Sequence, residues 1–185
     1  MDIERGQKIS IIGKNGVGKT TLLKILAGKL KHDTGTFKWG HGVSIGYYSQ
    51  EYEGLDYDRS VLENLKDLAF DEIYLRKFLG NFLIKGDMVF QKVYTLSGGE
   101  KTRLALCRIF LQNYNVLLLD EPTTYLDPKS QEILLNTLKE YEGTLILVSH
   151  SPSFVRGLGI DKVLLMPEER YTFFKDEYIE LVGIT

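Results

Sequence analysis

One segment near the start of the chain restricts its fold more than any other: KISIIGKNGVGKTTLLKILAGKL. It begins as a short buried strand (8–13) and ends as a helix (19–30) with leucine and isoleucine at helical spacing. The loop between them fits the pattern G-x-x-x-x-G-K-[ST], carried by Gly13, Gly18, Lys19 and Thr20. Strand, glycine loop and helix in this order predict a parallel α/β sheet built around the loop.

This glycine loop is suited to binding phosphate groups. Glycines let consecutive backbone N–H groups point inward, and the N-terminus of the following helix adds positive potential. Lys19 is placed to reach the β- and γ-phosphates of a nucleotide, and the Thr20 hydroxyl is placed to ligate Mg²⁺. We expect the loop to bind the nucleotide through Gly13, Asn15, Gly16, Gly18, Lys19, Thr20 and Thr21.

The rest of the chain predicts alternating strands and helices. Strands are expected at 34–40, 43–50, 115–120, 144–150 and 161–166, and an edge strand followed by a short helix in the tail 170–182. Helices are expected from Ser97 to about Asn113, opened by a capping box, and over 128–141, opened by Asp127 and Pro128. This order predicts the P-loop NTPase fold of the α/β class, with a mostly parallel sheet and helices on both faces.

Residues 51–95 interrupt this alternation and predict a small helical subdomain. A serine–glutamate capping box precedes a helix expected over 61–70, and a second helix over 72–80 is expected to end at Gly80.

The size of the chain, 185 residues, is that of one domain. The helical subdomain is expected to be inserted in a core made of 1–50 and 96–170. Net charge is −2, from 23 basic and 25 acidic residues, so the domain has no general attraction for nucleic acid.

Composition also bounds the location of the chain. No apolar run approaches the ~20 residues that a membrane span needs, so no direct membrane insertion is expected. The N-terminus has no apolar signal core. The single cysteine, Cys107, suits a reducing compartment and is expected to be a small core residue. A cytoplasmic location follows.

Four polar residues end predicted strands and should meet at one edge of the sheet. Asp120 ends an apolar strand and would hold the metal with Thr20, while Glu121, the next residue, would polarise an attacking water. Gln50 would touch the metal or the water, and His150 would bond the γ-phosphate. Taken one at a time, these are also the polar residues expected at any solvated strand end.

A second possible anion site opens the helix that follows the helical subdomain. Ser97, Gly98 and Gly99 lie at its N-terminus, where free N–H groups and the helix dipole favour an anion. Ser97 comes 77 residues after Thr20 and need not reach the same phosphate. The simplest other anion is the γ-phosphate of a nucleotide on a facing domain, which predicts a head-to-tail pair that buries two ATP molecules.

Taken together, the motifs resemble those of the ATP-binding-cassette (ABC) family. In chain order they are GKNGVGKTT, Gln50, LSGGE, VLLLDEP, YLD and His150, matching the family's phosphate loop, Q-loop, signature, metal strand, D-loop and switch histidine. The resemblance implies that ATP binding closes two cassettes and that hydrolysis reopens them, with Asp127 communicating between sites. The partner would be a second cassette, on the same parent chain or in a homodimer.

Within the family, LSGGEKTRLAL is similar to the ABC-F branch, whose members carry two cassettes on one chain and act at the ribosome. The resemblance implies a piece of a longer protein that is a translation factor or a ribosome-protecting antibiotic-resistance factor, contacting ribosomal RNA through other parts of the parent protein. The first alternative is the soluble ATPase subunit of a membrane transporter. The second is a binding module in which occupancy by ATP, with slow hydrolysis, is the signal.

The chain departs from the ABC-F pattern at three points. Thr124 and Tyr125 stand where the branch has Asn-His, which puts coupling through the D-loop in doubt, and Ser151 stands where it has Asp beside the histidine. The family also stacks adenine on an aromatic residue upstream of the phosphate loop, and residues 1–12 contain none.

Overall fold

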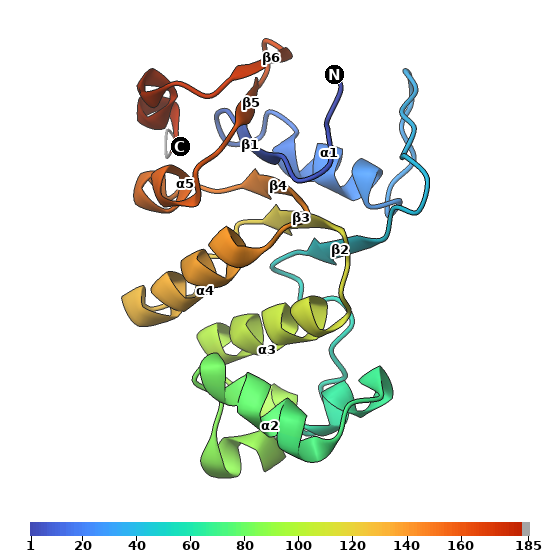
Figure 1. Ribbon diagram of the computed structural model, residues 1–185, viewed down its shortest axis with the longest axis vertical. Helices are drawn as coiled ribbons and strands as arrows, with labels where there is room; N and C mark the ends of the chain where they lie inside the picture. Colours follow the sequence, from blue (N-terminus) through green and yellow to red (C-terminus); the bar gives the residue numbers. More distant parts are fainter. Residues whose placement is uncertain (183–185) are drawn as a thin grey trace.

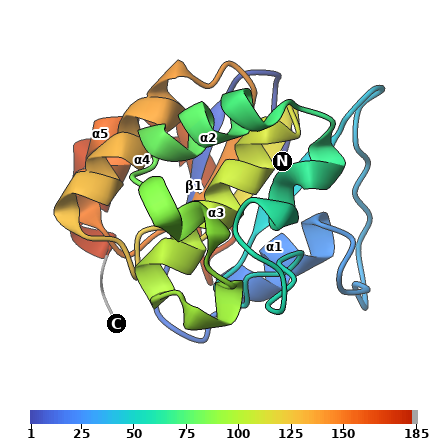
Figure 2. The ribbon, with the colours of Figure 1, turned by 90° about the horizontal axis from the view of Figure 1, so that it is seen from below.

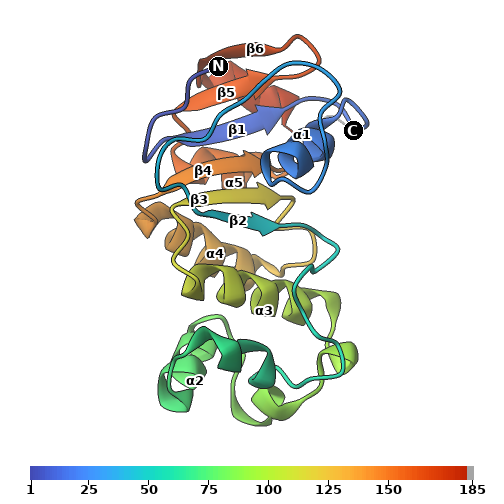
Figure 3. The same ribbon diagram turned by 90° about the vertical axis from the view of Figure 1, so that its right-hand side faces the viewer.

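The computed structural model describes residues 1–182 of the chain. Six strands form one sheet in the order β2-β3-β4-β1-β5-β6, best followed in Figure 3. They are β1 (Lys8–Ile12), β2 (Ile45–Tyr48), β3 (Val116–Asp120), β4 (Thr144–Val148), β5 (Lys162–Leu165) and β6 (Arg170–Phe173). Strands β1 to β5 pair in parallel, and β6 pairs antiparallel with β5 at the edge. The prediction of an α/β fold with a mostly parallel sheet is confirmed.

Helices cover both faces of this sheet (Figure 1). One face carries α1 (Lys19–Leu26), and the other carries α3 (Gly98–Leu111), α4 (Pro128–Glu140) and α5 (Pro152–Leu158). Alternate residues of a strand point to opposite faces. Leu118 of β3 therefore packs with Leu23 of α1, whereas Leu117 packs with Leu106 and Leu134 on the other face. Both faces of the sheet are buried under helices, which explains why β3 and β4 are apolar almost throughout.

The helical lobe, residues 51–95, lies beyond the β2 edge of the sheet (Figures 1 and 3). It contains α2 (Glu72–Asn81) and three 3₁₀ helices, Glu63–Leu68, Gly86–Phe90 and Val93–Thr95. Its buried residues pack against Leu104, Cys107 and Leu111 of α3, and Cys107 is a core residue as predicted. Because α3 serves the lobe and the sheet at once, its N-terminus is held by both. Among the described residues, no helix combines the length and the apolar character that spanning a membrane requires.

One strand prediction is wrong. Residues 34–40 form no strand but belong to an extended loop that stands away from the body in Figure 2. The segment has suitable residues, but it pairs with no strand within 1–182. Gly35 and Gly42 take left-handed conformations, and Phe37 stays 44% exposed. Strand propensity alone does not form a ladder without a neighbour.

The helix predictions need four corrections. The helix expected over 61–70 is a 3₁₀ helix over Glu63–Leu68, although its capping box forms as predicted. Gly80 does not end α2, because the helix runs to Asn81 and Leu83 takes the left-handed conformation (φ 62°). The helix expected over 19–30 ends at Leu26. Helix α5 was not predicted, although Pro152 at its first position was a usable signal.

Candidate active site

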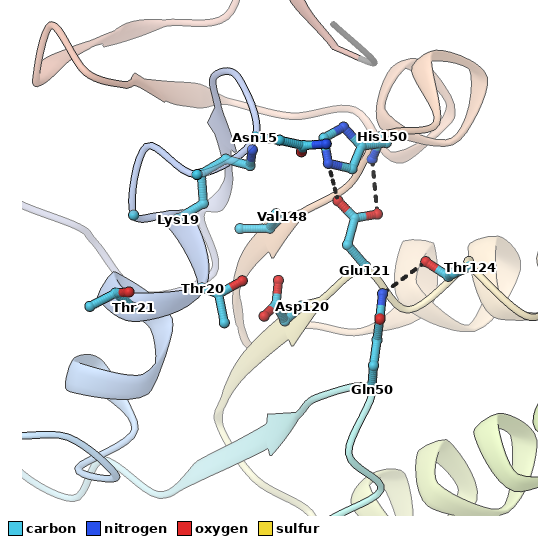
Figure 4. Close-up of a pocket in the computed structure, with 12 residues that line it drawn as sticks. Asn15, Lys19, Thr20, Thr21, Gln50, Asp120, Glu121, Thr124, Val148 and His150 are labelled. Carbon is cyan, nitrogen blue, oxygen red and sulfur yellow. Dashed lines mark hydrogen bonds and ion pairs between the residues drawn. The ribbon is translucent and has the colours of Figure 1, made fainter. Parts of the chain in front are cut away.

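The carboxyl ends of the parallel strands open into a pocket of about 450 Å³ (Figure 4). Its lining combines the glycine loop, the start of α1 and the residues that follow β2, β3 and β4. The lining residues are Asn15, Gly16, Gly18, Lys19, Thr20, Thr21, Gln50, Asp120, Glu121, Thr124, Val148 and His150. The residues predicted to meet at one sheet edge do meet there. Gly13 does not line the pocket, but its carbonyl faces Lys19.

Lys19 is held inside its own loop. Its Nζ donates hydrogen bonds to the carbonyl oxygens of Gly13 at 2.6 Å and Lys14 at 3.0 Å. The side chain is mostly buried, and burial lowers the pKa of Lys19, partly offset by the charges of Glu121 and Asp120. Gly18 has a φ of 101°, a conformation that favours glycine. The loop is thus a preformed cradle in which the ammonium group takes carbonyl partners.

Asp120 presents a buried oxygen without a partner. The residue is 6% exposed, and its Oδ1 accepts no hydrogen bond. Burial raises the pKa of Asp120, and the neighbouring Thr20 hydroxyl works in the opposite direction. An unpaired buried carboxylate oxygen beside a hydroxyl fits Mg²⁺, which prefers oxygen ligands. No group of three His, Cys, Asp or Glu within residues 1–182 could hold a metal. Mg²⁺ is commonly held by one or two carboxylates together with substrate phosphates, and Asp120 beside Thr20 can supply such a carboxylate.

Glu121 and His150 form a close pair at the end of β4. The backbone N–H of His150 donates to Glu121 Oε2 at 3.0 Å, and His150 Nε2 lies 3.2 Å from Oε1 (Figure 4). That second approach is too poorly aligned to count as a hydrogen bond. Burial raises the pKa of Glu121 to about 7, whereas burial and then Lys19 lower the pKa of His150. Burial thus favours the uncharged form of both side chains, and near pH 7 the Glu121 carboxyl is about half protonated.

Gln50 and Thr124 meet across the pocket. Gln50 Nε2 donates to Thr124 Oγ1 at 3.1 Å, so the amide is directed at the loop after β3 (Figure 4). The metal and water role assigned to Gln50 stays a prediction. Sequence reasoning named Thr124 as a departure and did not place it or Val148 in the site. Thr124 lies only three residues after Glu121, and this short spacing could have placed it in the site.

The second predicted anion site lies outside this pocket. Ser97 caps α3 together with Glu100: its Oγ accepts from the Glu100 N–H at 3.3 Å, and Glu100 Oε2 accepts from the Ser97 N–H at 2.7 Å. The Tyr52 hydroxyl donates to the Gly98 carbonyl at 3.1 Å. A Cβ at Gly99 would lie 2.6 Å from the Tyr125 carbonyl oxygen, so only glycine fits this approach.

Asp127 also lies outside the pocket and joins α4 to α3. It accepts from the Ser130 N–H at 3.1 Å as the N-cap of α4, and it lies 3.4 Å from Arg103 of α3. The hydrogen bonds with Ser130 lower the pKa of Asp127. The segment after β3 thus runs from the pocket to α3 within a few residues.

Known proteins share this architecture. The family model described as "ABC transporter" matches residues 1–124. The ABC transporter F family member 5 of Arabidopsis thaliana is 44% identical over 160 residues, which are 84% of this chain and 23% of that protein. Curated relatives at 39–48% identity are covered over only 23–34% of their own length.

Two solved structures extend the comparison. The ATP-binding cassette MJ0796, solved as a dimer in a post-hydrolysis state with ADP and Pi, superposes with a TM-score of 0.78 at 25% identity, covering 95% of this chain and 88% of that one. The archaeal ribosome recycling factor aABCE1, in complex with the ribosomal stalk protein aP1, gives a TM-score of 0.75 at 29% identity, covering 91% and 34%. The chain belongs to the ABC transporter family and has the P-loop fold of an ABC ATPase cassette.

Proposed function

We propose that this chain binds Mg-ATP in the pocket and hydrolyses it. The observation that carries the proposal is the Glu121–His150 pair, in which a buried carboxyl with a pKa raised to about 7 faces a phosphate-type loop. A general base is most effective when its pKa lies near the working pH. The ADP and Pi bound to MJ0796 support the same reading.

The residues divide the work as follows. Lys19 exchanges its two carbonyl partners for phosphate oxygens. Thr20 and Asp120, together with Gln50, would hold Mg²⁺, which would compensate phosphate charge. Glu121 accepts a proton from the water that attacks the γ-phosphorus while the bond to ADP breaks. His150 orients Glu121 and bonds the γ-phosphate. Removing a positioned base typically lowers a rate by about 10²–10⁴-fold.

Single-turnover release of phosphate tests this assignment. The Glu121→Gln variant should still bind ATP, because glutamine keeps an oxygen for the His150 N–H, and should release phosphate at least about 100-fold more slowly. If the variant hydrolysed ATP at the wild-type rate, Glu121 would not be the general base. Slow turnover in the wild-type chain as well would instead favour the binding-module reading.

For the second anion site we propose a role across a pair of cassettes. Ser97, Gly98, Gly99 and Asp127 would serve ATP held by a facing cassette, since they lie outside the pocket of their own chain. The dimer of MJ0796 supports such pairing. We further propose that residues 1–185 are one cassette, with the 51–95 lobe inserted, of a longer two-cassette protein, as the greater length of the curated relatives suggests.

The biological setting that we propose is the ribosome, with the protein acting as a translation factor or a ribosome-protecting resistance factor. The LSGGEKTR segment, the F-family relative and the similarity to aABCE1 support this setting. The test is co-sedimentation of the longer parent protein carrying Glu121→Gln with purified ribosomes, with and without ATP. A membrane-vesicle arm serves as the control. Binding to membranes instead of ribosomes would favour a transporter subunit.

A further inference from the structure

Three buried polar atoms lie where β2 and β3 end, on the α1 side of the sheet, and have no hydrogen-bond partner among residues 1–182. They are the Tyr47 hydroxyl, the Ser49 hydroxyl and Oδ1 of Asp120. Ser49 is 5% exposed and Asp120 is 6% exposed, and the Tyr47 oxygen itself is shielded from solvent. Buried polar atoms are almost always paired, because leaving one unpaired lowers the stability of a fold. A group of three therefore needs an explanation.

The pairing of β2 with β3 places these side chains on one face. Tyr47 is the cross-strand partner of Leu118, and both side chains belong to the core between the sheet and α1. Alternate residues of a strand share a face, so Ser49 follows Tyr47 to this side and Asp120 follows Leu118. The three unpaired atoms are thus brought together by strand register.

The two hydroxyls are donors that Asp120 lacks. The Ser49 hydroxyl approaches the Tyr47 hydroxyl closely enough to affect its pKa, but not in hydrogen-bonding geometry. Burial raises the pKa of Tyr47, and the charge of Asp120 is the next cause. The Tyr47 hydroxyl therefore keeps its proton near neutral pH and can donate it in a hydrogen bond. An ionised carboxylate only accepts, so the three groups are complementary.

The cations near Asp120 already have other partners. Lys24 of α1 acts on the Asp120 charge, but its Nζ is paired with Glu51 at 3.0 Å. Lys19 donates to the carbonyls of its own loop. The remaining neighbour is Thr20, which faces Asp120 across the pocket (Figure 4). The sheet side of Asp120 is thus left to the two hydroxyls.

A carboxylate in this position can serve a metal and accept hydrogen bonds at once. It offers about four lone-pair sites, so binding a metal leaves sites for other donors. Groups that hydrogen-bond to a ligating carboxylate fix its orientation, and losing them typically weakens metal binding by about 10–100-fold.

We propose that Tyr47 and Ser49 position Asp120 for Mg²⁺. With Mg-ATP bound, their hydroxyls would donate to the Asp120 carboxylate, directly or through one water, and hold it toward the metal. The inference rests on the proposed binding of Mg-ATP and adds two positioning residues, neither of which lines the pocket. Removing the hydroxyls should therefore weaken metal binding without weakening the nucleotide-free fold.

Two calorimetric titrations measure the contribution of the metal. ATP is titrated into the 185-residue chain carrying Glu121→Gln, which keeps the ATP intact, once with excess Mg²⁺ and once with EDTA. The dissociation constant in EDTA divided by that in Mg²⁺ gives the metal ratio. Adding Tyr47→Phe and Ser49→Ala should lower this ratio by about tenfold or more, while the affinity for metal-free ATP stays unchanged. A merely distorted pocket would weaken both titrations equally.

Urea denaturation without nucleotide supplies the second measurement. Because the Tyr47 hydroxyl has no partner in this state, Tyr47→Phe should leave the denaturation midpoint unchanged or raise it. Tyr48→Phe is the matched control, since the Tyr48 hydroxyl is on the opposite face of the same strand and bonds to Thr102 at 3.2 Å. That variant should lower the midpoint and keep the metal ratio. Asp120→Asn should abolish the metal ratio.

The outcomes separate the inference from its basis. A metal ratio that survives the double variant, or an equal loss in both titrations, would overturn the role of the two hydroxyls. A midpoint lowered by Tyr47→Phe would show that its hydroxyl is paired within the fold and would overturn that role too. If Asp120→Asn keeps the metal ratio, the magnesium site fails together with this inference. Absence of ATP binding would refute the proposed function itself.

Discussion

Replacing Glu121 by glutamine should stabilise the nucleotide-free chain, and more so at high pH. Burial raises the pKa of Glu121 from 4.5 to about 7. In the unfolded chain the same carboxyl ionises near its ordinary pKa, so between the two values the folded state binds the extra proton. Stability contributed by this group is therefore present below about pH 4.5 and lost as the pH rises to 7. Glutamine cannot ionise and escapes this loss.

The magnitude follows from the size of the shift. One pKa unit corresponds to about 1.4 kcal/mol, so the wild-type chain loses about 3 kcal/mol that the variant keeps. Solvent screens this little, because the side chain of Glu121 is 13% exposed. Glutamine preserves the acceptor for the His150 N–H at 3.0 Å, so that donor stays paired. A gain of this size is a substantial part of the free energy of unfolding of a domain.

Urea denaturation at pH 5, 6, 7 and 8 without nucleotide measures the effect. The difference in the free energy of unfolding between variant and wild type should grow by about 1.4 kcal/mol per pH unit up to pH 7 and then stay constant. Glu132→Gln, at an exposed carboxyl of α4, is the matched control and should show no such trend. A difference that does not change with pH, or that shrinks as the pH rises, would refute the reasoning.

Three further predictions concern nucleotide chemistry. The kcat/KM for ATP should rise with pH through about 7, as Glu121 loses its proton; a flat profile from pH 6 to 8 argues against Glu121 as the base. Lys19→Ala should weaken ATP binding by about 10–100-fold in calorimetry, the worth of a charge-assisted hydrogen bond, and unchanged affinity would contradict the assigned role. Gly99→Ala should prevent ATP-driven pairing in sedimentation and leave single-chain binding intact, because its Cβ would lie 2.6 Å from the Tyr125 carbonyl oxygen. Gly80→Ala is the control, because a Cβ there would meet no atom within 4 Å. Normal pairing of the Gly99→Ala variant would contradict the prediction and show that the Tyr125 backbone can move aside.

Sequence reasoning succeeded where residue type and backbone conformation are tied together. The glycine loop needs Gly18 at a φ of 101°, and Asp127 before Pro128 is a local start signal that α4 obeys. The meeting of Asp120 and His150 was also predictable, because Asp120 ends one parallel strand, His150 follows another, and such ends share one edge. These features depend on neighbours in sequence or on sheet topology.

It failed where a residue's partner is distant in the chain. Residues 34–40 have strand-forming residues, but no strand within the described chain pairs with them. The 3₁₀ segment Glu63–Leu68 is bonded to Arg108 of α3, which donates to the carbonyl of Asn64, 44 residues away, and to the carboxylate of Asp67, 41 residues away. The direction of the Gln50 amide depends on Thr124, 74 residues away. No local pattern encodes these three outcomes.

The pocket and the proposed second anion site at the start of α3 lie far apart in the sequence but are directly connected in the structure. Gln50 lines the pocket, and two residues later the Tyr52 hydroxyl holds the Gly98 carbonyl. Thr124 lines the same pocket, and Tyr125, its neighbour, packs against the glycines of the signature. Two short segments, 50–52 and 124–125, thus connect the pocket to the start of α3. They are joined at the pocket by the hydrogen bond from Gln50 to Thr124. We therefore expect a movement of Gln50 or Thr124 at the pocket to be passed to the start of α3 through these two connections.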